Sequence, residues 1–213
     1  MKNALLIVGA GGHGKVAAET ALAAGWNSVV FLDDRVEELQ ESFRWPVKGS
    51  VSDAVNLLDS YADAIVAVGH AETRLQLIRQ LSELGFHLPA LVHPSAWVSP
   101  SAELGMGSVV FANAAVNAEA ELGRGVIVNT GATVDHDCVI DDGVHICPGV
   151  HLAGEVSVGR GSWIGIGSCV IQQLRIGERV TVGAGSAVVR SVEDGERVAG
   201  VPAQMIGSNA EEG

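Results

Sequence analysis

The chain has 213 residues, which is enough for one large domain or two small ones. Its 25 acidic residues outnumber 13 Lys and Arg, giving a formal net charge of −12, so we expect no nucleic-acid partner. No apolar run approaches the roughly 20 residues of a membrane span, and the N-terminus lacks the basic and apolar regions of a signal peptide. Three cysteines without a C-x-x-C pair, Cys138, Cys147 and Cys169, fit the reduced thiols of a cytoplasmic protein.

Residues 1–90 alternate between strand and helix patterns. Apolar runs predict strands at 4–8, 29–32 and 64–68, and amphipathic stretches predict helices at 13–24 and 71–84, the second ended by Gly85. Strands separated by helices indicate a parallel sheet. We therefore predict an α/β domain over this range.

The first predicted strand leads into "GAGGHG", in which Gly9, Gly11 and Gly14 form G-x-G-x-x-G, the dinucleotide-binding fingerprint. Asp33 and Asp34 follow about 20 residues later, where a ligand's ribose or base would lie. A full dinucleotide fold needs two mononucleotide-binding halves, and only one is present, so the domain would hold one nucleotide and not NAD. The alternative is a tight turn without a ligand.

From Val92 onward the aliphatic residues recur every six positions, which is neither a helical nor a strand period. Small or aliphatic residues follow four positions after each of them, and glycine often follows directly. A six-residue repeat predicts a parallel β-helix whose triangular coils contain 18 residues, with Gly and Asn at the corners. The aliphatic series is Val92, Val98, Leu104, Val110, Val116, Leu122, Val128, Val134, Ile140, Ile146, Leu152, Val158, Ile164, Val170, Ile176, Val182 and Val188.

With these hexads and the ending "VAGVPAQMIG", the chain resembles the left-handed β-helix acyltransferases of the hexapeptide-repeat superfamily. An α/β half-domain with "GAGGHG" and "LDD" before such a prism resembles a narrower group, the bacterial N-acetyltransferases of UDP-4-amino-4,6-dideoxy sugars and the related sialic-acid O-acetyltransferases. The expected fold is therefore a Rossmann-like half-domain at 1–90, a left-handed parallel β-helix at 91–207 and a tail at 208–213. The expected reaction moves acetyl from acetyl-CoA to the amino group of a UDP-amino sugar for glycan assembly.

The resemblance also implies where the sugar nucleotide binds. The Gly-rich loop would cradle its diphosphate, and the two aspartates would meet the uracil or ribose. His13 would donate to a phosphate oxygen or simply lie solvated at the helix start. The implied residues are Gly12, His13, Gly14, Asp33, Asp34 and Gly69.

Polar residues of the prism concentrate in "NTGATVDHDCVIDDGVHICPGVHLAG". Acyl transfer to an amine needs a proton acceptor, and histidine beside a carboxylate suits that task. His136 lies two positions after Val134, near a corner, with Asp135 and Asp137 on either side. The alternative reading of His136 is a solvated corner histidine.

The resemblance assigns roles at matching positions. His136 falls on the general base and Asp137 on its orienting carboxylate, which is often the longer Glu in relatives. Asn129 falls on a substrate-side position, and His145 falls on a residue that meets acetyl-CoA. The alternative reading of His145 is that it merely packs against a neighbouring subunit. Three further positions fall on CoA or oxyanion contacts made by the backbone: Gly154, Ile166 and Ala184, the last often Gly in relatives.

The resemblance further implies a homotrimer with active sites between subunits, acetyl-CoA as co-substrate and no metal. Three alternatives stay open. The same fold could acetylate a sugar hydroxyl, as in sialic-acid O-acetylation. A zinc carbonic-anhydrase-like trimer would need three histidines as ligands, and His145 and His151 are six apart, a spacing not recognised as that family's. A scaffold module would use the prism only to trimerise.

Overall fold

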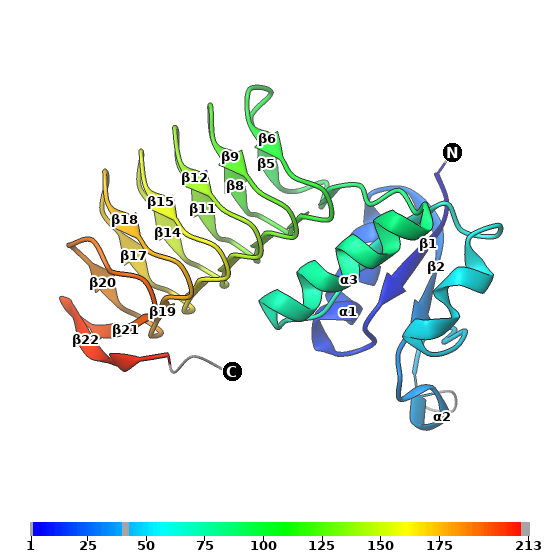
Figure 1. Cartoon of the computed structure of the whole chain (residues 1–213). Helices are drawn as coiled ribbons and strands as arrows, with labels where there is room; N and C mark the ends of the chain where they lie inside the picture. Colours follow the sequence, from blue (N-terminus) through cyan, green and yellow to red (C-terminus); the bar gives the residue numbers. More distant parts are fainter. Residues whose placement is uncertain (1, 40–42, 210–213) are drawn as a thin grey trace.

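The computed structural model describes residues 2–39 and 43–209, which form an α/β part followed by an elongated prism (Figure 1). Of the tail predicted at 208–213, residues 210–213 lie outside the described range. No helix within the described ranges has the length and apolar character that a bilayer crossing requires.

The α/β part is a three-stranded parallel sheet in the order β2-β1-β3. Helix α1 connects β1 to β2, and α3 follows β3 and leads into the prism (Figure 1). Gly85 ends α3 with a φ of +105°, as the sequence predicted. This sheet is one half of a dinucleotide fold, which confirms that prediction. The elements are β1 (Lys2–Val8), α1 (Gly12–Ala23), β2 (Trp26–Leu32), α2 (Val36–Leu39), the 3₁₀ helix η1 (Val51–Leu57), β3 (Asp63–Val66) and α3 (Ala71–Leu84).

From residue 91 to 188 the prism is a parallel β-helix of two-residue strands, and its pairing register advances by 18 residues per coil, as from Ile127 to His145. Two longer strands that pair antiparallel with each other close its end. In each of these two-residue strands the second residue belongs to the predicted aliphatic series and points inward. The six-residue repeat is therefore confirmed as three flat sides.

We name the three sides by their sheets. The first side contains β4 (Leu91–Val92), β7 (Val109–Val110), β10 (Ile127–Val128), β13 (His145–Ile146), β16 (Trp163–Ile164), β19 (Thr181–Val182), β21 (Glu196–Gly200) and β22 (Ala203–Ser208). The second contains β5 (Trp97–Val98), β8 (Ala115–Val116), β11 (Thr133–Val134), β14 (His151–Leu152), β17 (Cys169–Val170) and β20 (Ala187–Val188). The third contains β6 (Glu103–Leu104), β9 (Glu121–Leu122), β12 (Val139–Ile140), β15 (Ser157–Val158) and β18 (Arg175–Ile176).

The edges between these sides turn at residues with positive φ, which recur every six positions from Gly107 to Gly185. The first edge joins the first and second sides and includes 130–131, 148–149, 166–167 and 184–185. The second edge joins the second and third sides and includes 118–119, 136–137, 154–155 and 172–173. The third edge joins the third and first sides and includes 106–107, 124–125, 142–143 and 160–161.

The corners differ from the prediction that Gly and Asn would occupy them. Asn113 fits, but five other non-glycine corner residues are charged or carry an amide, and all six are exposed. An exposed corner side chain meets no packed neighbour, and the ladders on both sides fix its φ at a cost of about 1–2 kcal/mol. The five are Glu119, Asp137, Glu155, Gln173 and Arg179.

Glycines that directly follow an inward aliphatic residue have a separate role. A Cβ atom on Gly159 would lie 2.7 Å from the backbone of Gly177 and Glu178, and one on Gly165 would lie 2.5 Å from the carbonyl oxygen of Val182. These positions lack a side chain because the next coil stacks directly against them.

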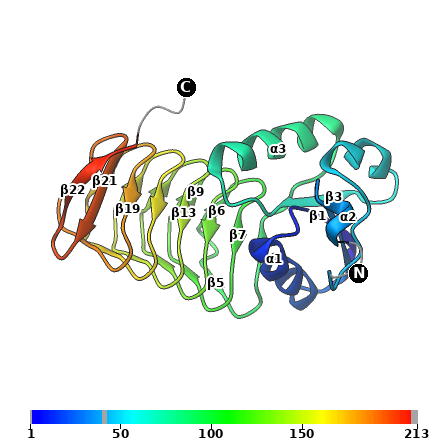
Figure 2. The same ribbon diagram turned by 90° about the horizontal axis from the view of Figure 1, so that it is seen from below.

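The α/β part covers the beginning of the prism. Outward residues of the first side, including Val109 and Ile127, share a core with α1 and the sheet. Helix α3 lies along the first coils in both views (Figure 1, Figure 2), and its Leu75 and Ile78 contact the glycine corners of the third edge.

We expect Gly159→Ala to lower the free energy of unfolding by about 3 kcal/mol, because the added methyl group meets backbone that cannot move aside. Gly149→Ala is the matched control: its Cβ meets nothing within 4 Å, and its φ of +66° costs about 1 kcal/mol. Urea unfolding at one protein concentration measures both. Equal losses would contradict the stacking role.

Candidate active site

The Gly-rich turn after β1 leaves an open helix start. Gly9 has a φ of +105°, and a Cβ there would lie 2.8 Å from the carbonyl oxygen of Ala67, while a Cβ on Gly14 would collide with the carbonyl oxygen of Gly9. Gly11 and Gly12 face open space. The N–H groups of residues 12–14 precede the first bond within the helix, from Lys15 N–H to Gly11 (3.1 Å), so they can receive an anion.

The carboxylate of Asp33 supports that turn through a hydrogen bond. One carboxylate oxygen accepts the N–H of Ala10 (2.8 Å), and both oxygens accept from the guanidinium of Arg35 at 3.0 Å. The hydrogen bonds from Arg35 lower the pKa of Asp33 to about 2. Asp34 is exposed and accepts the N–H of Val51 (3.0 Å) at the start of η1. Both residues thus lie at the end of β2, with Asp33 supporting the Gly-rich turn and Asp34 facing solvent.

His13 points from the start of α1 toward the prism. Its ring packs edge-on against Phe111, 5.4 Å between centroids, and its Nε2 atom is buried with no hydrogen-bond partner. The ring is half-buried, so the alternative of a solvated histidine does not hold. Donation from His13 to a phosphate oxygen stays a prediction.

His145 lies on the first side beside Asn129. The carbonyl oxygen of the Asn129 side chain accepts the N–H of Thr130 (2.8 Å), so its amide nitrogen donates to Nε2 of His145 (3.0 Å). His145 is therefore neutral, with its proton on Nδ1. Burial lowers its pKa to about 3, assisted by the charge of Arg74.

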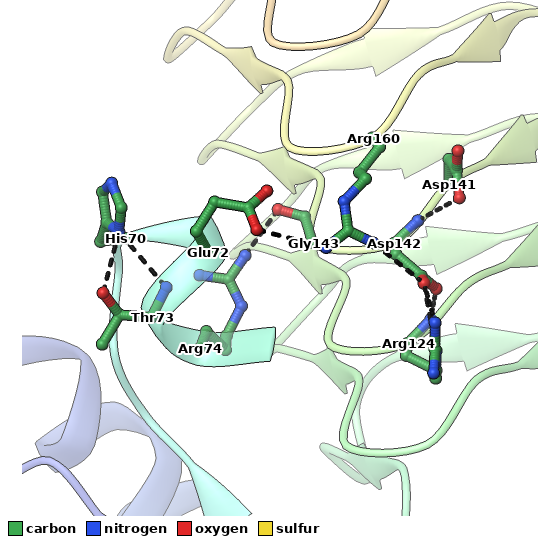
Figure 3. Close-up of polar contacts among 9 residues, drawn as sticks. All are labelled: His70, Glu72, Thr73, Arg74, Arg124, Asp141, Asp142, Gly143 and Arg160. Atoms are coloured by element: carbon green, nitrogen blue, oxygen red, sulfur yellow. Dashed lines mark hydrogen bonds and ion pairs between the residues drawn. The ribbon is translucent and has the colours of Figure 1, made fainter. Parts of the chain in front are cut away.

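Arg74 lies where the two parts meet (Figure 3), and the residue is 1% exposed. It donates to the carbonyl oxygens of Val68 (2.8 Å) and Gly69 (2.7 Å) after β3, and to those of Gly125 (2.8 Å) and Gly143 (2.7 Å) on the third edge. Burial lowers its pKa to about 10, so it stays charged at neutral pH. Burial and then this charge lower the pKa of His13 to about 4.

His136 projects from the second edge with the geometry of a base. Its Nδ1–H donates to Asp137 (2.7 Å), and its backbone N–H donates to Asp135 (2.8 Å), which also accepts from Asn117 (2.9 Å). The hydrogen bond to Asp137 raises the pKa of His136, while Asp135 and Glu155 add smaller effects in the same direction. Nε2 therefore keeps a basic lone pair.

Gly154 lies one coil beyond His136 and directly beneath its ring. A Cβ atom on Gly154 would come within 2.5 Å of Cε1 and Nε2 of that ring. Among the described residues, the carbonyl oxygen of Gly154 accepts a hydrogen bond from the backbone N–H of Gln173 (3.0 Å). The missing side chain thus lets Nε2 approach the backbone at this point.

The remaining predicted residues lie on the first edge. Ile166 is 54% exposed, and Ala184 one coil further is also exposed. The second edge, with His136, is the one edge that does not border the first side, where His145 and Asn129 lie. A single chain therefore does not bring His136 and His145 together.

Other features lie away from these residues. No group of three or more His, Cys, Asp or Glu within residues 2–39 and 43–209 is arranged to hold a metal ion. One surface groove of about 460 Å³ runs between α3 and the third edge, and another of about 430 Å³ lies on the third side. Neither is lined by any predicted site residue. His151 contacts the hydroxyl of Thr133 (2.9 Å) on the second side.

Sequence reasoning missed Arg74 and Phe111. Arg74 falls on the apolar stripe of α3, between Ala71 and Ile78, and a charge on a buried face is the signal that could have found it. Phe111 follows an inward aliphatic at a position usually held by a small or polar residue. Its aromatic ring marks where the α/β part packs.

Comparisons with known proteins agree with this architecture. Residues 4–81 match the family model described as the PglD N-terminal domain. UDP-N-acetylbacillosamine N-acetyltransferase of Bacillus subtilis (strain 168) is 41% identical over 116 residues, 53% of this chain, and the match spans about half (52%) of that relative's length.

Two solved structures match nearly the whole chain. The acetyltransferase domain of PglB from Neisseria gonorrhoeae FA1090, in complex with acetyl coenzyme A, is 48% identical with a TM-score of 0.92, covering 97% of this chain and 100% of that one. PerB from Caulobacter crescentus, in complex with CoA and GDP-perosamine, is 38% identical with a TM-score of 0.91, covering 96% and 97%.

The Asp33 contacts make stability depend on pH. Folding lowers this pKa to about 2 from an unfolded value of about 4, so the stabilisation is complete above pH 4 and is lost as the pH falls through 2. We expect Asp33→Asn to lower the free energy of unfolding by about 2 kcal/mol at pH 7, with the difference from wild type shrinking between pH 4 and pH 2.

Urea unfolding at several pH values measures this difference. The exposed Asp59 supplies a control, because Asp59→Asn should stay within about 0.5 kcal/mol of wild type at pH 7. A difference for Asp33→Asn that persists unchanged at pH 2 would rule out the charge as its origin.

Proposed function

Because this chain belongs to the β-helix N-acetyltransferases represented by the PglB acetyltransferase domain and PerB, we propose that it transfers acetyl from acetyl-CoA to the amino group of a nucleotide-linked amino sugar. The observation that carries the proposal is the His136–Asp137 pair, whose free Nε2 lies over the backbone of Gly154. This pairs a proton acceptor with a backbone surface that a thioester can approach closely.

The proposed chemistry assigns roles to five of the predicted residues. The amine attacks the thioester carbonyl, Nε2 of His136 takes a proton from the attacking nitrogen, and the backbone N–H of Gly154 stabilises the oxyanion. Collapse of this intermediate forms the amide and expels the CoA thiolate. Asp137 orients the ring and raises its basicity. Ile166 and Ala184 contact CoA along the first edge.

The sugar nucleotide is proposed to bind at the Gly-rich turn. The free N–H groups of residues 12–14 would face its diphosphate, with Asp34 and the loop at Gly69 beside it. We propose UDP as the nucleotide; the Bacillus subtilis relative is named for a UDP sugar, whereas PerB holds GDP-perosamine. We also place the protein in the cytoplasm, because its three cysteines are free thiols.

A panel of UDP- and GDP-linked 4-amino sugars, assayed for release of free CoA, tests the proposal. Turnover with UDP sugars supports it in full, and turnover with GDP sugars alone corrects the nucleotide. If acetyl-CoA binds but no sugar of the panel causes the release of free CoA, the proposed activity is refuted.

We further propose a homotrimer in which each site combines two chains. The support is geometric: His136 lies on the second edge, while His145 and Asn129 lie on the first side, which that edge does not border. A neighbouring prism that presents its second edge to this side would bring the two histidines together. Flat-sided prisms favour such head-to-tail packing around a threefold axis.

For the base itself, we expect His136→Ala to lower kcat by about 10²- to 10⁴-fold while either substrate still binds. Asp137→Asn should do less harm and shift the acidic limb of kcat/KM to lower pH, because losing the carboxylate lowers the pKa of the imidazole. Steady-state kinetics at saturating substrates measure both. A His136→Ala protein that keeps more than about a tenth of wild-type kcat excludes this base.

The composite site predicts complementation between two impaired variants, His136→Ala in proton transfer and His145→Ala in its contact with acetyl-CoA. Each proposed site takes His136 from one chain and His145 from its neighbour. When His136→Ala and His145→Ala chains are co-expressed in equal amounts, each of these two histidines is intact with a chance of about one in two. About a quarter of the sites should then be complete, in a closed ring of three chains. Each variant expressed alone is the control. Mixed trimers with no more activity than these controls would show that each site lies within one chain.

A further inference from the structure

Arg74 connects three segments of the chain that serve different substrates in the proposed function. Its Nη1 bonds the loop after β3 at Val68 and Gly69, and its Nε bonds Gly125. Its Nη2 bonds the carbonyl oxygen of Gly143, as Figure 3 shows. Among the described residues it is the largest side chain that is fully buried. One guanidinium thus ties the α/β part to two successive coils of the prism.

The two ends of this connection lead directly to the site. The loop after β3 runs beside the Gly-rich turn, because Ala67 N–H donates to Val8 (2.7 Å) and Ala67 blocks any Cβ at Gly9. On the prism, Gly125 precedes β10, which ends just before Asn129, and Gly143 precedes β13, which begins with His145. Arg74 therefore holds the nucleotide side and the Asn129–His145 pair in one frame.

The third edge is shaped to admit this arginine. Gly125 and Gly143 have φ values of +62° and +71°, and a Cβ on them would lie 2.7 Å from Ile78 and 2.9 Å from Leu75. Their missing side chains let α3 lie close enough for the guanidinium to reach their carbonyl oxygens. A nearby ion-pair network, in which Arg160 bonds Glu72 (3.2 Å), is exposed and adds little.

Arginine is specifically required for this geometry. All four hydrogen bonds of the side chain go to main-chain carbonyl oxygens, which are fixed in direction by the loop and the coils. A planar guanidinium can satisfy several fixed acceptors at once, whereas a lysine ammonium has three donors on one atom and cannot span them. These hydrogen bonds therefore fix the distance between the loop after β3 and the coils of the prism, in addition to holding the two together.

We propose that Arg74 is a positioning residue that sets the spacing between the bound sugar nucleotide and the prism that holds acetyl-CoA. This inference rests on the proposed function, because it assigns the loop after β3 to one substrate and the prism to the other. Misplacing reacting groups by about 1 Å can cost about 100-fold in rate. Loss of the connection should therefore lower kcat while each substrate still binds its own part.

The principal test compares Arg74→Lys with wild type and with Arg79→Lys, an exposed arginine on the same helix. Calorimetry gives the Kd of a UDP-amino sugar alone and of CoA alone, and steady-state kinetics give kcat. Hydrogen exchange of the segments at 66–70 and 143–147 reports the connection without any need for turnover. Circular dichroism and urea unfolding establish that each variant is folded.

For Arg74→Lys we expect kcat to fall between about 10- and 100-fold, both Kd values to stay within about threefold, and exchange to quicken in both segments. Arg79→Lys should match wild type in every measurement. A kcat within about threefold of wild type overturns the inference. So does a loss that appears only in the Kd of the sugar nucleotide, since that would make Arg74 a binding residue.

Two further outcomes lead to different conclusions: an Arg74→Lys protein that does not fold, and a wild-type protein that shows no activity. If Arg74→Lys does not fold, Gly143→Ala keeps the arginine but places a methyl group 2.9 Å from Leu75 and strains a φ of +71°, which disturbs the third edge where Arg74 donates. A fall in kcat without a change in Kd is then expected, and an unchanged kcat overturns the inference. If wild type releases no CoA, the proposed function fails, and hydrogen exchange still decides whether Arg74 connects the two segments.

Discussion

The main-chain ladder between successive 18-residue coils is the constraint on which the rest of the structure depends. Each coil hydrogen-bonds to the next in register, so residues that are 18 apart in sequence lie directly above one another. The ladder fixes where a side chain is forbidden, as at Gly159 and Gly165, and where the chain must turn with positive φ. Asp137 occupies such a turn, so its backbone conformation belongs to the prism and is not strain peculiar to the site.

Because of this ladder, the separation of two residues in sequence determines how their side chains lie relative to each other in the site. Residues His136 and Gly154 are 18 apart, so the imidazole lies over a backbone position that carries no side chain. The nine-residue separation of His136 and His145 is half a coil, so the same ladder places them on opposite parts of one prism. One prism cannot turn both histidines toward one substrate, which is the geometric support for the proposed homotrimer.

The surroundings of the two histidines shift their pKa values in opposite directions. His136 is exposed and donates to a carboxylate, which raises its pKa and suits it to accept a proton. His145 is half-buried, accepts from Asn129 and lies near Arg74, so its pKa falls to about 3 and it stays neutral. A neutral imidazole can bind a thioester or an amide without competing for the proton that the reaction releases.

The sequence by itself determined the hexads, the half-sized α/β domain and the His136–Asp137 pair, because each depends on local spacing or on a fixed repeat. A six-residue period has one structural solution, and neighbours in sequence stay neighbours in space. Only the tertiary structure decided the role of Asp33 as a support for the Gly-rich turn, the burial of His13 against Phe111 and the connection made by Arg74. The Asp33 contact joins residues 23 positions apart within the α/β part, and the His13 and Arg74 contacts join residues up to 98 positions apart between the α/β part and the prism, so no local pattern encodes them.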